Sequence, residues 1–172
     1  GHSVHCLLEH KRTHAFAGCI RLVMSTDKDL LPFEANCKEA IDPSIIDPSK
    51  IRKGGFGEIS RLAVPASFRK RKGEQKQPFI IGEQMDAPPH AYSEVERRQF
   101  PNIAISLYLS SLAYVDLLGF DYVFVMMEPR LKRHLKRLGI IFEQAGHEID
   151  YHGIRGLFYL KREDLTRHFP AE

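Results

Sequence analysis

Three polar residues lie inside a run of the kind that forms a buried strand. Glu58, Ser60 and Arg61 occur within residues 56–64, among aliphatic and aromatic neighbours. A carboxylate can take a proton, a hydroxyl can donate to an oxyanion, and an arginine can bind a carboxylate. Burying such groups is unfavourable unless they are paired. The run therefore predicts either a functional cleft or a buried ion-pair network.

Strand geometry assigns these side chains to faces. Because side chains alternate along a strand, we expect Glu58 and Ser60 on one face and Arg61 on the other. The same rule places Leu62 on the face of Glu58. Arg21, in the middle of a second predicted strand, is a candidate partner for Glu58.

The elements that must position these residues form a predicted mixed α/β sheet. Strands are expected at residues 3–8, 18–24, 56–64, 120–127, 140–143, 148–151 and 157–160, and helices at residues 102–118, 129–138 and 164–169. Residues 25–55 and 65–98 read as long irregular connections. Residues 102–118 are apolar almost all round, between Pro101 and Gly119, which predicts a buried helix. The strands that flank this helix are expected to be parallel neighbours.

Charge is segregated along the chain. The net charge is +3, yet residues 65–77 and 128–137 each carry five basic residues and one acidic residue. Such segments suit an anionic partner: a carrier protein, a phosphate-bearing cofactor, nucleic acid or a membrane surface. The alternative is a solvated surface. A length of 172 residues, with 43% hydrophobic and 27% charged residues, indicates one globular domain and argues against disorder.

Compartment signals favour the cytoplasm. No window approaches the ~18 consecutive apolar residues of a membrane span, and no signal peptide is expected. Cys6, Cys19 and Cys37 are odd in number and lack a C-x-x-C spacing. Reduced thiols are therefore expected in place of disulfides or a zinc site.

Several runs resemble those of known acyltransferases. The run EISRLAV at residues 58–64 resembles the strand motif of acyl-homoserine-lactone synthases and long-chain N-acyl amino acid synthases. The run GCIRLV at residues 18–23 resembles the earlier Gly…Arg-Leu motif of the same enzymes. The closest resemblance is to the acyltransferase family associated with PEP-CTERM/exosortase systems, through the runs HSVHCLL at 2–8, MMEPRL at 126–131, LGI at 138–140 and DYHG at 150–153.

The resemblance implies a GNAT-like (N-acetyltransferase-like) α/β fold, in which helices flank a mixed central sheet with splayed parallel strands. It implies one domain over residues 1–172 that transfers a fatty acyl group from an acyl-carrier-protein or acyl-CoA thioester to a small amine such as an amino acid. Glu58 is then the acid/base or amine-orienting residue, and Ser60 a donor to the oxyanion. Arg61 and Arg21 would bind an acceptor carboxylate or pair with Glu58.

Further residues acquire roles from this resemblance. An apolar slot for the acyl chain is expected from Leu62, Leu107, Phe120, Val123 and Val125, each of which is equally an ordinary core residue. Docking of the phosphopantetheine-bearing donor is expected from Arg69, Lys70, Arg71 and Lys72, and from Arg130, Arg133 and Arg137, which share one helical face. The donor is a substrate, and neither a metal nor a permanently bound cofactor is expected.

Two features depart from the resembled families, and three alternatives stay open. The families carry an N-terminal segment before the first strand, whereas this chain begins at the strand. The pyrophosphate loop of acetyl-CoA enzymes is incomplete at residues 68–73. The alternatives are a non-catalytic acyl-binding or partner-binding relative, an acetyl-CoA-dependent N-acetyltransferase, and a nucleic-acid-binding protein. The last is disfavoured, because no RNA- or DNA-binding motif occurs.

Overall fold

The computed structural model describes residues 2–68, 92–100 and 102–168. The chain forms two compact units. The first unit contains Gly1–Val4, Leu22–Ser60 and Leu112–Glu172, and the second contains His5–Arg21 and Arg61–Ser111. Each unit is described by itself below.

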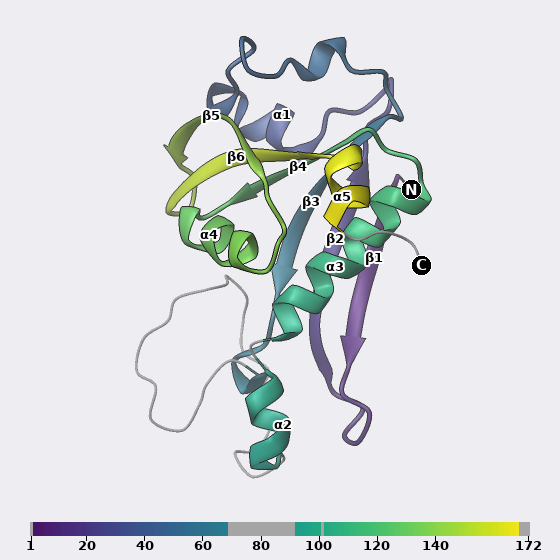
Figure 1. The fold of residues 1–172 in the computed structure, drawn as a ribbon, viewed down its shortest axis with the longest axis vertical. Helices are drawn as coiled ribbons and strands as arrows, with labels where there is room; N and C mark the ends of the chain where they lie inside the picture. Colours follow the sequence, from purple (N-terminus) through teal and green to yellow (C-terminus); the bar gives the residue numbers. More distant parts are fainter. Residues whose placement is uncertain (1, 69–91, 101, 169–172) are drawn as a thin grey trace. The chain divides into compact units, whose positions relative to one another are not determined.

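Six strands form one mixed sheet, in the order β1-β2-β3-β4-β6-β5 (Figure 1). The strands are β1 (Ser3–Glu9), β2 (Phe16–Met24), β3 (Phe56–Ala63), β4 (Tyr122–Met127), β5 (Glu143–Asp150) and β6 (Ile154–Lys161). The helices are α1 (Pro32–Asn36), α2 (Glu94–Gln99), α3 (Asn102–Leu117), α4 (Pro129–Arg137) and α5 (Arg162–His168). Strands β3 and β4 are parallel, as predicted, and β6 is antiparallel to both β4 and β5.

Three predicted segments need correction. A strand at residues 140–143 is wrong, because Ile140 still donates to the Leu135 carbonyl at the end of α4 and β5 begins only at Glu143. The connection at residues 25–55 contains helix α1, and the connection at residues 65–98 contains most of helix α2. Both helices are short, so neither shows a sustained helical period in its sequence.

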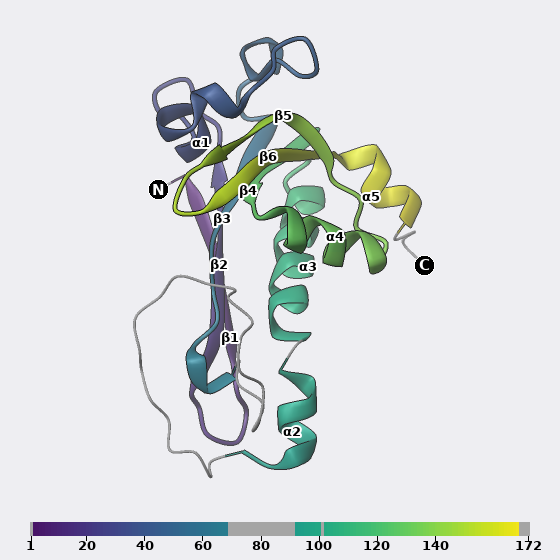
Figure 2. The same ribbon diagram turned by 90° about the vertical axis from the view of Figure 1, so that its left-hand side faces the viewer.

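The core of the first unit lies between α1 and the sheet. A buried cluster joins α1 and its flanking residues to β3, β4, β5 and β6, and consists of Leu31, Phe33, Cys37, Ala40, Phe56, Phe124, Ala145, Leu157 and Tyr159. We call this side of the sheet the α1 face. On the opposite side, which we call the α4 face, the Lys132 ammonium of α4 lies 4.8 Å from the centre of the Phe158 ring. Figure 2 shows α1 and α4 on opposite sides of β4 and β6.

Helix α3 is not buried all round, so that prediction is wrong. Its buried side chains form one stripe at helical spacing, made of Ile103, Leu107, Tyr108, Ser111, Leu112 and Val115. Leu117, by contrast, is 78% exposed. None of the described helices, α3 included, is long and apolar enough to cross a bilayer.

In the second unit, the Glu96 carboxylate ties α2 to the turn between β1 and β2. Its Oε1 lies 3.0 Å from His10 Nε2, and it accepts two hydrogen bonds from the Arg12 guanidinium, at 3.1 and 3.0 Å. The Ser93 N–H donates to Glu96 Oε2 at 2.6 Å, while the Glu96 N–H donates to the Ser93 hydroxyl at 3.3 Å. This reciprocal pair is a capping box, which explains why α2 begins here.

Replacing Glu96 with glutamine is expected to lower the melting temperature at pH 7. The Arg12 guanidinium and then the Ser93 N–H hold the pKa of Glu96 far below its ordinary value of 4.5. A carboxylate whose pKa is depressed by folding stabilises the fold above its unfolded pKa, and this contribution is lost as the pH falls. The melting-temperature difference between the wild type and Glu96→Gln should therefore shrink as the pH falls below 4.5. Glu94→Gln, at an exposed position of the same helix, is the control. A pH-independent difference would contradict this account.

Candidate active site

Strands β3 and β4 pair over only part of their lengths. Their parallel register runs from Phe56 opposite Tyr122 to Ile59 opposite Val125, and ends there among the described residues. Both strands continue, β3 to Ala63 and β4 to Met127. The two strands therefore part after Ile59 and Val125, as expected of a splayed parallel pair.

Backbone geometry marks the same point on β3. Arg61 has a φ of 53°, in the left-handed region that non-glycine residues rarely adopt. Such a residue interrupts the pleat, as in a β-bulge. Faces therefore cannot be counted through Arg61, and the placement of Leu62 on the face of Glu58 stays a prediction.

Glu58 is buried at this parting point, with 3% of its surface exposed. It lies opposite Phe124, on the α1 face. Its Oε2 accepts a hydrogen bond of 2.8 Å from the Phe33 N–H, in the first turn of α1. Amides at a helix N-terminus have no partner within the helix and favour negative charge. The short helix α1 therefore stabilises a carboxylate that the core would otherwise disfavour.

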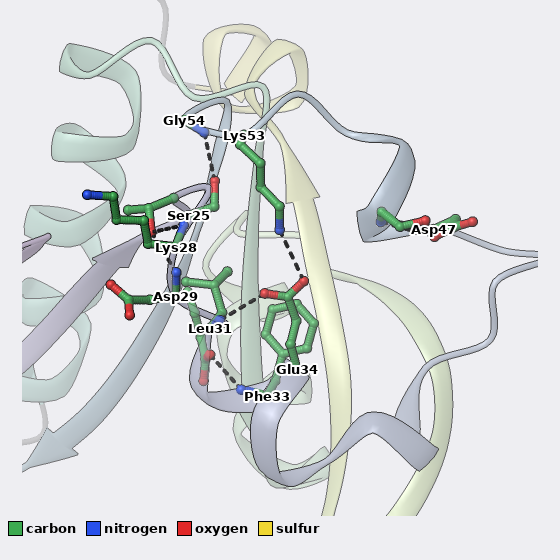
Figure 3. A network of polar contacts seen from close by, with 12 residues as sticks. Ser25, Lys28, Asp29, Leu31, Phe33, Glu34, Asp47, Lys53 and Gly54 are labelled. Atoms are coloured by element: carbon green, nitrogen blue, oxygen red, sulfur yellow. Dashed lines mark hydrogen bonds and ion pairs between the residues drawn. The ribbon is translucent and has the colours of Figure 1, made fainter.

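The loop that carries α1 is held by its own polar contacts (Figure 3). The Glu34 carboxylate accepts from the Leu31 N–H at 2.8 Å and lies 3.5 Å from the Lys53 ammonium. The Gly54 N–H donates to the hydroxyl of the buried Ser25 at 3.0 Å, which closes the ends of the loop. These contacts fix the Phe33 amide against Glu58.

The structure separates two groups of predicted residues within the first unit. Val123 and Val125 are fully buried, and they pair with Leu160 and Phe158 of β6. They therefore lie on the α4 face, whereas Glu58 lies on the α1 face. Ser60, directly after the paired register, is half-buried. Phe120, just before β4, is buried against Gly57.

The other predicted residues of the strands and of α3 belong to the second unit. Leu107 is buried and packs against Gly18, where a side chain would collide with it. Leu62 and Arg21 are half-buried, and Arg61 is exposed. The Arg61 carbonyl lies 3.9 Å from the Cys19 thiol, which donates to it. Functional roles for these four predicted residues remain predictions.

Comparison with solved structures places this geometry among known folds. No family model and no curated protein matches the sequence. TofI in its apo form matches with a TM-score of 0.62 and 12% identity, over 99% of this chain and 74% of TofI. FeeM, an N-acyl amino acid synthase from uncultured soil microbes, matches at 0.61 and 15%, over 98% and 77%. BjaI, a CoA-dependent acyl-homoserine lactone synthase solved with SAM and isopentyl-CoA, matches at 0.60 and 14%, over 96% and 62%.

The chain has the fold of these synthases. Its six-stranded mixed sheet, with helices on both faces in the first unit, confirms the predicted GNAT-like fold class. At these identities the likeness concerns the fold, and the chemistry must be argued from the residues of this chain.

The basic helix of this synthase-like fold is exposed. Arg130, Arg133 and Arg137 all point to solvent, and none of them forms an ion pair or hydrogen bond within the part of the chain that the structure describes. Their positive charge is therefore available to an anionic partner. The other predicted docking residues, Arg69, Lys70, Arg71 and Lys72, lie outside the described residues.

A cavity of about 930 Å³ opens elsewhere in the first unit. It is lined by residues of the 43–52 segment, by Asp121 and Tyr122 at the start of β4, and by Lys161, Arg162 and Glu163 where β6 ends and α5 begins. None of the predicted site residues lines it. Among the described residues, no group of three or more His, Cys, Asp or Glu side chains is placed to hold a metal ion.

Sequence reasoning missed two features of the first unit that bear on Glu58 and its face of the sheet. Helix α1, which donates to Glu58, lies in a segment predicted to be irregular, although Pro32 at its first position is a helix-start signal. Arg155 on β6 was not singled out. Its Nε is buried and has no hydrogen-bond partner within the described residues, a property that depends on tertiary packing and leaves no sequence signal.

Proposed function

We propose that this protein is an N-acyltransferase that moves a fatty acyl group from a carrier-protein or CoA thioester to the amine of an amino acid or a similar small molecule. The observation that carries the proposal is the buried Glu58 carboxylate beside the point where β3 and β4 part. Support also comes from the fold shared with FeeM and BjaI.

The proposed step is direct transfer. The amine nitrogen bonds to the thioester carbonyl carbon, the C–S bond breaks, and the thiolate leaves as the amine loses a proton. Glu58 is the group that accepts this proton or orients the amine, because it is the buried carboxylate beside the point where the two strands part. No covalent acyl-enzyme is required, so none of the three cysteines is assigned a role.

The parted strands supply the remaining requirements of the reaction. N–H groups that follow Ile59 and Val125 lie beyond the parallel register and are candidates for binding the oxyanion, together with the Ser60 hydroxyl. Since Glu58 and Val125 lie on opposite faces, we place the acceptor on the α1 face and the acyl chain, beside Val123 and Val125, toward the α4 face. The two substrates then meet at the gap between the strands.

A finer assignment rests on the sequence runs. We assign the chain to the acyltransferases associated with PEP-CTERM/exosortase systems, and we expect it to act in the cytoplasm. The DYHG run forms the turn between β5 and β6, where the Asp150 carboxylate accepts from the Gly153 N–H at 3.1 Å and His152 adopts a φ of 53°. The residue types of this run therefore suit the tight turn that joins β5 to β6.

The test is a thiol-release assay on the purified full-length protein. Acyl-CoA donors of two to sixteen carbons, and the same chains on acyl carrier protein, are offered with an equimolar set of the protein amino acids, and products are identified by mass spectrometry. Acceptor-dependent thiol release with an N-acyl product supports the proposal. Transfer from acetyl-CoA alone would favour an N-acetyltransferase. Binding of acyl donors without transfer to any acceptor would favour a non-catalytic acyl-binding protein.

Charge reversal on α4 is expected to weaken the use of carrier-linked donor. Acyl carrier proteins are acidic, and steering by surface charge acts mainly on association. The double variant Arg133→Glu and Arg137→Glu should raise KM for the carrier-linked donor by about tenfold, with kcat retained. The effect should shrink at high salt. A control with the same charge change, Lys11→Glu with Lys28→Glu, should leave KM unchanged. An unchanged KM in the α4 variant would remove α4 from the docking surface.

A further inference from the structure

Arg155 is a half-buried cation without a counter-ion on the α1 face. It lies near the start of β6, and its Nε is buried without a hydrogen-bond partner. Within the described part of the chain it forms neither an ion pair nor a hydrogen bond. A buried donor left unpaired is unfavourable, and a charged one more so. The positive charge of such a group calls for a negative partner, and an anionic ligand can supply it.

Register places Arg155 on the same face as Glu58. On β6, Arg155 shares its face with Leu157 and Tyr159, two members of the buried cluster on the α1 face. Tyr159 pairs with Phe124, which in turn pairs with Glu58. Arg155 precedes Tyr159 by four residues, so it lies two strands across from Glu58 and four residues along β6 from the position opposite it.

The separation of the two residues matches the length of one small ligand held between them. Strand spacing and rise put the Cα atoms of Glu58 and Arg155 about 16 Å apart. A glutamate and an arginine side chain extended along the sheet span most of such a distance, so a ligand of only a few atoms can contact both ends. Both charges act on the Cys37 thiol: burial raises its pKa, the negative charges of Glu39 and Glu58 raise it further, and Arg155 lowers it.

We propose that Arg155 binds the carboxylate of an α-amino-acid acceptor whose amine lies at Glu58. A zwitterionic amino acid carries a carboxylate a few atoms from its ammonium group, and these complement a guanidinium and a carboxylate set at the two ends of one site. An arginine recognises a carboxylate through two parallel N–H···O bonds, which orients the acceptor as well as binding it. The inference rests on the proposed function, since it names the acceptor class of the same site.

The test compares amino acids with their decarboxylated amines, for example leucine with isopentylamine and phenylalanine with phenethylamine, using the acyl donor that the thiol-release assay selects. Wild-type protein should prefer the amino acid. Arg155→Gln should lower kcat/KM for the amino acid by about 10- to 100-fold, mainly through KM, and leave the amine unaffected. Arg155→Lys should fall between the two. Arg162→Gln, at a half-buried arginine paired with Asp116, is the matched control.

Two further readouts separate this inference from the proposed function. An equal loss with both acceptors, or no loss, would overturn the role of Arg155 while acyl transfer stands. If wild-type protein acylates neither acceptor, the proposed function fails, and calorimetric binding of the same amino acids and amines decides about Arg155 alone. Arg155→Met should keep or raise the melting temperature, because it removes an unpaired buried donor. A marked drop in that temperature would indicate a structural arginine instead.

Discussion

Glu58→Gln is expected to lower kcat by about 100- to 10,000-fold, the range typical of losing a general acid or base. Glutamine keeps the size of the side chain and an oxygen that can accept from the Phe33 N–H, but it cannot take a proton. The fold should therefore survive while the chemical step is lost. The measurement is acceptor-dependent thiol release under saturating donor, together with circular dichroism of both proteins.

The matched control for this variant is Glu34→Gln. Glu34 also accepts a hydrogen bond at the start of α1, from the Leu31 N–H, and its carboxylate contacts the Lys53 ammonium. It is not placed at the parting point of β3 and β4. A loss of turnover in Glu34→Gln as large as in Glu58→Gln would mean that both carboxylates act only by holding α1. Near wild-type turnover in Glu58→Gln would remove Glu58 from the chemistry.

Phe124→Ala is expected to reduce the free energy of unfolding by about 3–5 kcal/mol. Phe124 is completely buried at the centre of the α1-face cluster. Its ring centre lies 4.9 Å from that of Phe33 and 5.8 Å from that of Phe56. Truncation removes these contacts and leaves a cavity among side chains from three separate elements, which cannot all close in.

Urea unfolding, followed by circular dichroism, measures this loss. Phe16→Ala is the control, because the Phe16 ring, at the start of β2, is 62% exposed and its removal should change stability by less than about 0.5 kcal/mol. Similar midpoints for Phe124→Ala and the wild type, with unchanged slopes, would show that the cluster is not the main core of the first unit.

Hydrophobic pattern alone was sufficient to place the central elements. Residues 120–127 form a nearly continuous apolar run, which predicted β4, and the helix between the two strands predicted its parallel pairing with β3. The same reasoning singled out Glu58, because a charge inside an apolar strand is conspicuous. Local composition records what a strand buries, so elements and polar residues of this kind can be recognised without a structure.

Contacts between distant segments were not predictable in this way. Nothing in the sequence indicates that the Phe33 amide meets Glu58, since that contact depends on how the loop of residues 25–55 closes. Arg155 looks like an ordinary polar residue near the start of a strand until the register of three strands is known. The positive φ of Arg61 likewise has no signal in the sequence, although it interrupts the alternation of side chains on which counting by twos depends.

The pairing of β3 with β4 also bears on the order in which the chain folds. Strands β5 and β6 are joined by a short turn and can pair early. Strand β3 can pair with β4 only after the long segment that carries α2 and α3 has brought the two strands together. Closing such a loop is entropically unfavourable, and non-local parallel pairing is slow. Glu58 reaches its place only in that late step. A refolding chain would thus regain most of its secondary structure before it regains a competent site.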